Sequence, residues 1–539
     1  MNQIYDVVII GAGMSGLAAT IRALMFDKNV LLLEKHSIAG GLNSYYSRGS
    51  RDFDVGLHAL TNYANPKLKH KNVNNNNNSD NSSSDNHSSN ISNLRANLRA
   101  NYNPNAFLKV LRQLRIPFDK MDLQQQRISK IDFAYQGCTL KFSNEMELLI
   151  SEVKEYFPKE IDNFIKLINF VVSYSDDNLY QPYLSAKEKV SEIIKDPLLL
   201  EMIFTPLFLY GSSWENDMDY SQFVIMFRSI FLEGFSKPKG GVRTIINLLL
   251  SRIQEECDKN AIYKIEKVLQ FNKKVSSLKL KDGKDGKDGE WEITLHSGEI
   301  IQSKKVISTI GYVETMGLVE KLEKEKLAKK DSEHSELVGN LSFTETILIL
   351  DKEIPANYQD TSIIFYNNNS LNKFFYNKPK DNVDSNSSVV CFPNNFGVNS
   401  LSSTSSSLLS SSESMIRFSM LANYQLWSKY SREEYIIEKA RLLKTSKTLL
   451  KKLLPTIDSG DTGQAKIIDH DIFTPRTIHK YTGHLQGSIY GAKLKFKDGR
   501  LPTANCHNLF LAGTDQGFLG IVGALLSGVT IANFYINQE

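Results

Sequence analysis

Three glycines and one acidic residue near the start of the chain have the types and spacing of a dinucleotide-binding site. Gly11, Gly13 and Gly16 form a Gly-x-Gly-x-x-Gly turn, and Glu34 follows them. In such a turn the first glycine permits a tight bend, the second lets the backbone approach a diphosphate, and the third lets a helix pack closely. An acid about 20 residues further on can accept hydrogen bonds from an adenosine ribose. The pattern predicts a dinucleotide cofactor.

The elements around these residues must hold them in place. Residues 4–10 are apolar and rich in β-branched side chains, which predicts a buried parallel strand. Residues 17–27 predict a helix, and residues 30–33 predict a second strand. This order places the glycine turn at a helix N-terminus, where phosphate binds favourably. Because the Glu34 carboxylate would repel a phosphorylated ribose, FAD or NAD fits better than NADP.

A second group of residues resembles a known superfamily of flavoproteins. It combines an acid, a glycine pair and a Phe-Asp-x-Gly-x-His sequence, with the residues Glu34, Lys35, Gly40, Gly41, Leu42, Phe53, Asp54, Gly56 and His58. Their order is similar to that in phytoene desaturases, carotenoid isomerases, retinol saturases and, more distantly, amine oxidases. Leu42 stands where amine oxidases and many phytoene desaturases carry an Arg. Carotenoid isomerases and retinol saturases often lack that Arg and favour a His such as His58.

Later segments match the same superfamily, namely residues 235–253, 275–280, 474–477, 490–491 and 508–528. The resemblance implies FAD as cofactor, with the backbone at Val275 holding the adenine and Asp515 near the ribityl chain. It also implies that the backbone of Ile521 and Val522 approaches the flavin ring. The remaining cofactor-binding residues that we expect are Ser15, Gly513 and Gly520.

These segments predict an α/β fold with a discontinuous, Rossmann-type FAD-binding domain and an inserted α+β substrate-binding domain. We expect the FAD-binding domain to comprise residues 1–70, 232–311 and 467–539. The mainly helical residues 100–231 and the mixed residues 312–466 then form the substrate domain, with a strand at 343–350 and a basic amphipathic helix at 433–454. Low-complexity residues 71–99 and 400–414 read as surface insertions, and the Lys-Asp-Gly repeats at 281–289 as a hairpin tip.

Composition and charge restrict the class of protein. With 64 basic and 60 acidic residues the formal net charge is only +4, and no basic stripe with interleaved aromatics occurs, so we expect no nucleic-acid partner. The 4 cysteines are scattered, which predicts no metal site and a reducing compartment. We expect no signal peptide, because the first apolar run ends in glycines, and no spanning helix, because no run reaches roughly 18 apolar residues. We expect a cytoplasmic protein, with a peripheral membrane contact as an open alternative.

Two apolar stretches, residues 197–210 and 223–232, bear on the substrate. They are rich enough in Leu, Phe and Met to line a long channel, but ordinary core has the same composition and is the preferred interpretation. A further hypothesis is that the first stretch dips into a membrane through Phe204 and Leu207.

The resemblance implies that the cofactor supplies most of the chemistry and that few catalytic side chains are required. His58 is the first candidate, because a histidine near the flavin could polarise or protonate a polyene; a hydrogen-bonded structural histidine is an equal alternative. Tyr490 is the second candidate. The leading hypothesis is an FAD-dependent oxidoreductase that desaturates, saturates or isomerises a hydrophobic polyene or isoprenoid, with NAD(P)H or a quinone as candidate electron partner.

Two alternatives stay open. An amine oxidase-like flavoprotein is disfavoured because Leu42 replaces the Arg and no aromatic pair for a cationic substrate is evident. Rab GDP-dissociation inhibitors and escort proteins resemble the same fold but bind prenylated partners without flavin; the complete glycine triplet and Glu34 argue against that class.

Overall fold

The computed structural model describes residues 3–56, 58–63, 106–175, 182–259, 265–281, 289–319, 336–397, 413–457, 464–502 and 506–538. The low-complexity residues 71–99, most of the serine-rich residues 400–414, and the Lys-Asp-Gly repeats at 282–288 lie outside the described residues.

The first sheet begins with the predicted strand–helix–strand unit. Strand β1 (Ile4–Ile10) leads into helix α1 (Met14–Leu24), and β2 (Val30–Leu33) pairs in parallel with β1. All four residues of β2 are buried, as expected for a strand covered on both faces. The two predicted strands are confirmed with the same bounds, and the helix ends three residues earlier than expected.

The remaining strands of this sheet come from distant parts of the chain. They are β9 (Leu269–Gln270), β10 (Val275–Lys281), β11 (Glu290–Leu295), β12 (Ile300–Ser308) and β18 (Leu509–Leu511). The order is β10-β11-β12-β1-β2-β9, and β18 pairs in parallel with β12. The antiparallel pairing of β10 and β11 agrees with the strands expected on either side of the Lys-Asp-Gly repeats, whereas the predicted hairpin tip lies outside the described residues. The α/β fold with a Rossmann-type unit is therefore confirmed.

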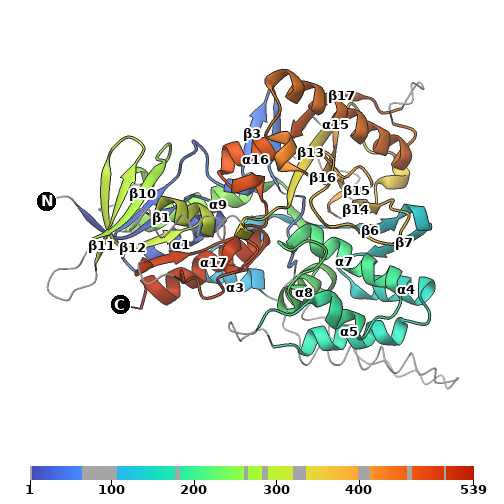
Figure 1. Cartoon of the computed structure of the whole chain (residues 1–539), viewed down its shortest axis with the longest axis horizontal. Helices are drawn as coiled ribbons and strands as arrows, with labels where there is room; N and C mark the ends of the chain where they lie inside the picture. Colours follow the sequence, from blue (N-terminus) through green and yellow to red (C-terminus); the bar gives the residue numbers. More distant parts are fainter. Residues whose placement is uncertain are drawn as a thin grey trace.

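One glycine lets the last helix pack against the first. Helix α17 (Gly520–Ile531) packs on α1, which also contacts α9 (Val242–Lys259). A Cβ atom on Gly528 would lie 2.0 Å from the backbone oxygen of Ser15, so only glycine permits this approach. The C-terminal segment is thereby fixed beside the opening βαβ unit (Figure 1).

A second sheet lies on the other side of the molecule, with the strand order β17-β13-β16-β15-β14-β6-β7. Its strands are β6 (Ile128–Phe133), β7 (Cys138–Phe142), β13 (Ser342–Leu350), β14 (Thr361–Asn367), β15 (Ser387–Cys391), β16 (Ser414–Ala422) and β17 (Ile467–Phe473). The expected strand at 343–350 is confirmed as β13. All neighbouring pairs are antiparallel except β14 and β6.

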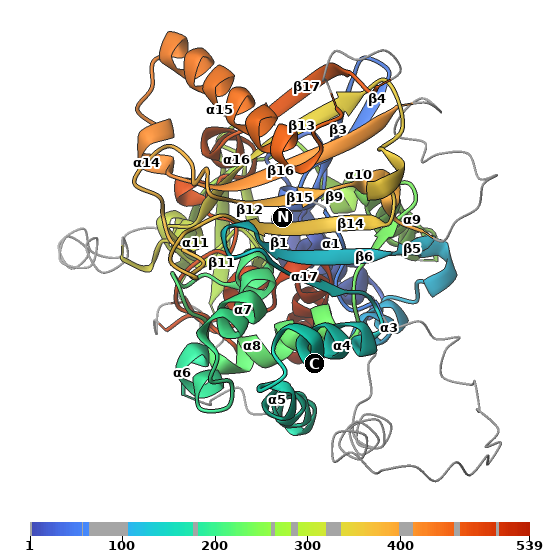
Figure 2. The same ribbon diagram turned by 90° about the vertical axis from the view of Figure 1, so that its right-hand side faces the viewer.

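Helices cover both faces of the second sheet. The basic helix α15 (Arg432–Leu453), predicted at 433–454, lies on one face. On the other side lie α4 (Met146–Tyr156), α5 (Ile161–Ser173), α7 (Pro197–Gly211) and α8 (Tyr220–Phe227). Figures 1 and 2 both show the sheet between α15 above and these helices below.

The remaining helices and strands are short. They are β3 (Tyr45–Arg48), β4 (Arg51–Asp54), α3 (Ala106–Gln113), β5 (Leu123–Gln125), α6 (Ala186–Ser191), β8 (Ser236–Pro238), α10 (Ile265–Val268), α11 (Tyr312–Leu318), α14 (Tyr424–Trp427) and α16 (Pro475–Thr482).

The apolar stretches in α7 and α8 are mainly core. Phe204 and Leu207 have 0% exposed surface, so the hypothesis that they dip into a membrane is wrong. They lie against other apolar side chains of α7, α8 and the second sheet. Among the residues that the structure describes, no helix combines the length and hydrophobicity needed to cross a bilayer.

Candidate functional site

A cavity of about 1320 Å³ is bordered by residues of both sheets and by α16. Pockets for a single drug-sized ligand measure roughly 300–1,000 Å³. The cavity therefore has room for a dinucleotide and a second molecule. One end of the cavity borders the glycine turn after β1, and the other reaches the middle of the second sheet.

The glycine turn is held to the end of β2 by Glu34. One carboxylate oxygen accepts a hydrogen bond from the backbone N–H of Ala12 at 2.7 Å, and the other accepts from the N–H of His36 at 2.8 Å. Glu34 is 8% exposed and borders the cavity. The acid thus fixes the shape of the turn and also faces the space where a ribose would lie.

The three glycines of the turn meet different surroundings. Gly11 has φ +98°, which favours glycine, and a Cβ on Gly16 would lie 1.9 Å from the backbone oxygen of Gly11. A Cβ on Gly13 would have no protein atom within 4 Å. Gly13 is also the N-cap of α1, with no side chain capping the helix. The space beside it, at a helix N-terminus, suits a diphosphate.

The C-terminal block contributes a second helix N-terminus to the cavity. Helix α17 starts at Gly520, and its N-cap Leu519 offers no side-chain hydrogen bond. Gly513, Gly520 and Ile521 border the cavity. Two helix N-termini from opposite ends of the sequence therefore face one space, which favours a ligand with negative charge.

Most of the residues that the sequence singled out lie together around this cavity. Those that border it are Gly11, Gly13, Ser15, Glu34, Lys35, Gly40, Gly41, Leu42, Gly56, His58, Val275, Tyr490, Gly513, Gly520 and Ile521. Gly16, Val522 and Asp515 do not. Gly16 packs on Gly11, and Val522 is 3% exposed in the core of the first sheet.

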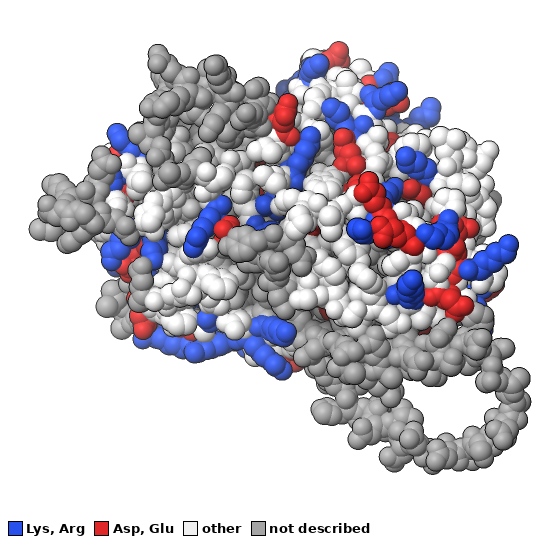
Figure 3. Space-filling view, turned by 60° about the horizontal axis from the view of Figure 1, so that its bottom comes forward, with Lys and Arg blue, Asp and Glu red and all other residues white. Residues whose placement is uncertain are grey.

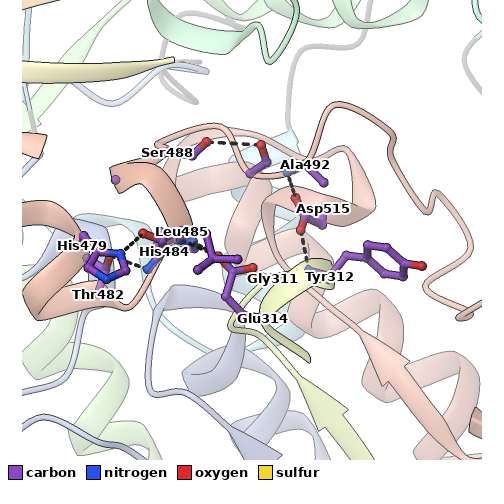
Figure 4. Close-up of polar contacts among 12 residues, drawn as sticks. Gly311, Tyr312, Glu314, His479, Thr482, His484, Leu485, Ser488, Ala492 and Asp515 are labelled. Carbon is purple, nitrogen blue, oxygen red and sulfur yellow. Dashed lines mark hydrogen bonds and ion pairs between the residues drawn. The ribbon is translucent and has the colours of Figure 1, made fainter. Parts of the chain in front are cut away.

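Asp515 is directed toward the protein backbone. Its carboxylate accepts hydrogen bonds from the N–H of Tyr312 at 2.6 Å and from the N–H of Ala492 at 2.7 Å (Figure 4). Lys495 lies 3.7 Å away, and Asp515 is 2% exposed. In the structure this acid ties the loop before α11 to the loop before β18.

Sequence reasoning missed one carboxylate that borders the cavity, that of Glu314. Glu314 borders the cavity and accepts a hydrogen bond from the N–H of Leu485 at 2.8 Å (Figure 4). His484 Nδ1 lies 3.8 Å from it. Burial raises the pKa of Glu314 and outweighs the attraction of His484. No pattern in the sequence around Glu314 pointed to it.

At the other end of the cavity, the second sheet carries a buried cluster of polar side chains. The Arg417 guanidinium donates to both oxygens of Glu345, at 2.6 and 2.7 Å. His58 Nε2 lies 2.9 Å from Glu345 Oε1 and 3.1 Å from the hydroxyl of Ser419. Glu345 pairs directly with Ser419 across β13 and β16, so both side chains share one face of the sheet.

The charges in this cluster shift the pKa values of its members. Burial alone would raise the pKa of Glu345, but Arg417 and His58 lower it to about 2. Burial lowers the pKa of His58 and outweighs the opposing effect of Glu345. At neutral pH the cluster therefore holds an ionised carboxylate and a neutral imidazole.

Two tyrosines lie beside the cluster. The Tyr490 hydroxyl donates to the backbone oxygen of Leu209. The Tyr210 hydroxyl is buried and has no hydrogen-bond partner among the described residues. Burial raises the pKa of both phenols, so both stay protonated at neutral pH. Both tyrosines border the cavity.

Surface charges and cysteines also bear on the sequence-based expectations. On the face shown in Figure 3, basic and acidic side chains lie side by side. The four cysteines are buried and none of them forms a disulfide with a described residue. The described residues contain no group of three His, Cys, Asp or Glu that could hold a metal ion.

Comparisons with known proteins agree with this geometry. Residues 9–71 match the family model of an NAD(P)-binding Rossmann-like domain. Prolycopene isomerase 2 of an Oncidium hybrid cultivar is 24% identical over 353 residues, which cover 59% of this chain and 50% of that protein. The all-trans-retinol 13,14-reductase of Danio rerio is 37% identical over 62 residues, covering 12% of this chain and 10% of that protein. The chain spans about half, or less, of the length of these curated relatives.

Solved structures share the whole fold at low identity. An oxidoreductase from Methanosarcina mazei superimposes with a TM-score of 0.60 at 14% identity, covering 98% of this chain and 99% of the other. A triple mutant of putrescine oxidase gives a TM-score of 0.54 at 12% identity, covering 99% of each chain. The predicted resemblance to carotenoid isomerases, retinol saturases and the more distant amine oxidases is confirmed.

Proposed function

We propose that the protein is an FAD-dependent oxidoreductase that acts on a hydrophobic polyene or isoprenoid. One observation carries the proposal: a single cavity joins the glycine turn and the Glu34 carboxylate to the face of a second sheet that carries His58. A cofactor at one end and a hydrophobic molecule at the other would therefore meet in the same cavity. Prolycopene isomerases and retinol reductases, to which the chain is similar, are named for polyene substrates.

The residues at the first end fit FAD. The open space at Gly13 would take the diphosphate, Glu34 would accept from the ribose hydroxyls, and the N-terminus of α17 would face the flavin. When bound, the flavin supplies the exchange of a hydride or electrons with the substrate. The candidate electron partner, NAD(P)H or a quinone, follows from this chemistry.

The chain itself would bind and orient the substrate and exclude water. Leu209, Phe343, Val389 and Ile489 border the second end of the cavity and present apolar surface. A hydrophobic molecule would gain roughly 25 cal/mol for each Å² of apolar surface that it buries there. His58 is the polar group that we propose as catalytic or substrate-orienting in this region, with Tyr490 as the second candidate.

Amine oxidation is less compatible with the charges at this end. A cationic amine would need an unpaired carboxylate, whereas both oxygens of Glu345 are already paired with Arg417. Leu42 also replaces the Arg expected of an amine oxidase. The fold shared with putrescine oxidase therefore does not favour its reaction.

The reaction type is tested by product analysis. FAD-loaded protein is incubated without oxygen with prolycopene, phytoene or all-trans-retinol, and the products are separated by chromatography. We expect conversion of at least one polyene; bleaching of the flavin would indicate desaturation, unbleached isomer conversion would indicate isomerisation, and saturation would require a reductant.

Two results would contradict the proposal. Peroxide formation from a panel of amines, with no conversion of the polyenes, would favour the amine oxidase alternative. Failure to bind FAD, combined with binding of a prenylated peptide, would favour the flavin-free class of prenyl-protein binders.

A further inference from the structure

The polar cluster in the second sheet lies beside apolar residues of the cavity wall, such as Val389 and Phe343. Arg417 is 1% exposed, and its side chain shares one sheet face with Glu345, Ser419 and the apolar Val389. Burying two charges is costly unless they are paired and hydrogen-bonded, and replacing such a pair by apolar residues often leaves stability unchanged or higher. Arg417 also donates to the backbone oxygen of Asp54 at 3.2 Å, which holds β4 against the second sheet. That contact does not explain a carboxylate that borders the cavity at Glu345.

The pair has a definite effect on His58. Glu345 is ionised and accepts only, so the ring nitrogen at 2.9 Å from it, Nε2, carries the proton. A neutral imidazole has one N–H, which leaves Nδ1 with an acceptor lone pair. Nδ1 makes no hydrogen bond with any residue that the structure describes. His58 itself borders the cavity.

A second polar group beside the cluster also lacks a partner. The hydroxyl of Tyr210 is buried without a hydrogen bond to any described residue, in a tyrosine that borders the cavity. It can donate or accept. A buried polar atom without a partner destabilises the protein unless a ligand or water satisfies it.

We propose that this cluster recognises one hydroxyl group on an otherwise apolar substrate. The substrate hydroxyl donates to His58 Nδ1 and accepts from Tyr210. Glu345 and Arg417 are positioning residues, which hold the imidazole in the tautomer whose lone pair faces the substrate. This inference rests on the proposed function and narrows its substrate class to isoprenoid or polyene alcohols.

The arrangement discriminates between related ligands. An ether or a hydrocarbon has no proton to donate, so Nδ1 would lose its contact with water and gain no partner. A carboxylate would place its negative charge near Glu345 and the imidazole lone pair. An alcohol should therefore bind more tightly than the ether, hydrocarbon or carboxylate with the same carbon skeleton.

The test compares two probes, all-trans-retinol and its methyl ether. Their dissociation constants are measured by fluorescence titration of the FAD-loaded protein. We expect retinol to bind roughly tenfold more tightly, since one hydrogen bond to an otherwise unsatisfied buried group contributes about that factor. The ratio of the two constants is insensitive to the folded fraction of a variant, because both probes report on the same molecules.

The decisive variant is His58→Gln. The glutamine amide reproduces the donor at Nε2 and so keeps the contact with Glu345, but it has no acceptor at the position of Nδ1. We expect the ratio of the dissociation constants, methyl ether over retinol, to fall to about twofold or less in this variant. His470→Gln, at an exposed position on β17 that does not border the cavity, is the matched control and should keep the wild-type ratio.

Positioning is tested at Glu345. In Glu345→Gln the amide oxygen can still accept from His58 Nε2–H, so the preference for retinol over its methyl ether should be largely kept. In Glu345→Leu no acceptor is left, and the preference should be lost. If Glu345 had a purely structural role, the preference for retinol over its methyl ether would not depend on an acceptor at this position.

Equal binding of the two retinoids by the wild-type protein, or an unchanged ratio in His58→Gln, would overturn the inference. If FAD binds while the retinoids are not distinguished, this inference fails and the proposed cofactor function stands. If FAD itself does not bind, the proposed function fails.

Discussion

Arg417 donates two parallel hydrogen bonds of 2.6 and 2.7 Å to Glu345. Glu345 borders the cavity, and Arg417 is 1% exposed. The two residues come from the adjacent antiparallel strands β13 and β16. The bidentate pair holds the Glu345 carboxylate in one orientation. Because His58 hydrogen-bonds to the same carboxylate, the orientation of its imidazole is fixed as well.

The first prediction concerns the stability of this pair. Arg417→Met leaves the Glu345 carboxylate buried without its cationic partner, and should lower the free energy of unfolding by about 3–5 kcal/mol. The double variant Arg417→Met/Glu345→Leu should recover most of that loss, because no charge is left behind. Urea unfolding of the single and double variants measures the coupling energy between Arg417 and Glu345. Additive losses would contradict a direct interaction.

The second prediction is a loss of stability in acid. The pKa of Glu345 is lowered from 4.5 to about 2, so its stabilising effect is complete above pH 4.5 and is lost as the pH falls toward 2. This effect is on the order of 3 kcal/mol. The pKa of His58 is also below its ordinary 6.5, so its protonation destabilises the folded state as the pH falls below 6.5.

Thermal unfolding between pH 7.5 and 5 isolates the histidine contribution. The wild-type melting temperature should fall over this interval, and that of His58→Gln should fall less. A wild-type protein that gains stability toward pH 5 would argue against a buried neutral histidine.

The third prediction separates cofactor binding from folding at the glycine turn. Gly13→Ala places its methyl group in open space, so the free energy of unfolding of the apoprotein should change by less than about 0.5 kcal/mol while FAD affinity falls at least about tenfold. In Gly16→Ala the new Cβ would lie 1.9 Å from the Gly11 oxygen, so both the free energy of unfolding and the affinity for FAD should fall. The two readouts are urea unfolding and FAD titration. Unchanged FAD affinity in Gly13→Ala would place the diphosphate elsewhere.

The fourth prediction concerns the apolar helix α7. Phe204 is fully buried, so Phe204→Ala should lower the free energy of unfolding by about 3–5 kcal/mol. Phe170→Ala on α5, where the ring is 46% exposed, is the control and should cost less than about 1 kcal/mol. Equal losses in urea unfolding would contradict the assignment of this stretch to the core.

Much of the first sheet could be predicted from the sequence because its signals are local. The apolar run of β1, the glycine turn, α1 and β2 follow one another within 30 residues, and each has a pattern set by backbone geometry. Glu34 could be found for the same reason, since its distance along the chain from the turn is fixed by the βαβ unit.

The substrate end of the cavity could not be predicted in the same way. Glu345, Arg417, Tyr210 and His58 meet only because strand pairing and helix packing bring distant segments together. A lone Glu or Arg in an apolar strand has no local pattern that marks a site. Asp515 illustrates the opposite difficulty: its segment was recognised, but the sequence did not reveal that its carboxylate binds the backbone at Tyr312 and Ala492.

The most direct test of the whole account is the flavin content of the folded protein. Apoprotein is titrated with FAD, and bound flavin is measured from its visible absorbance after removal of free cofactor. We expect one FAD per chain, with Gly13→Ala binding at least about tenfold more weakly. A folded wild-type chain that binds no FAD would contradict it.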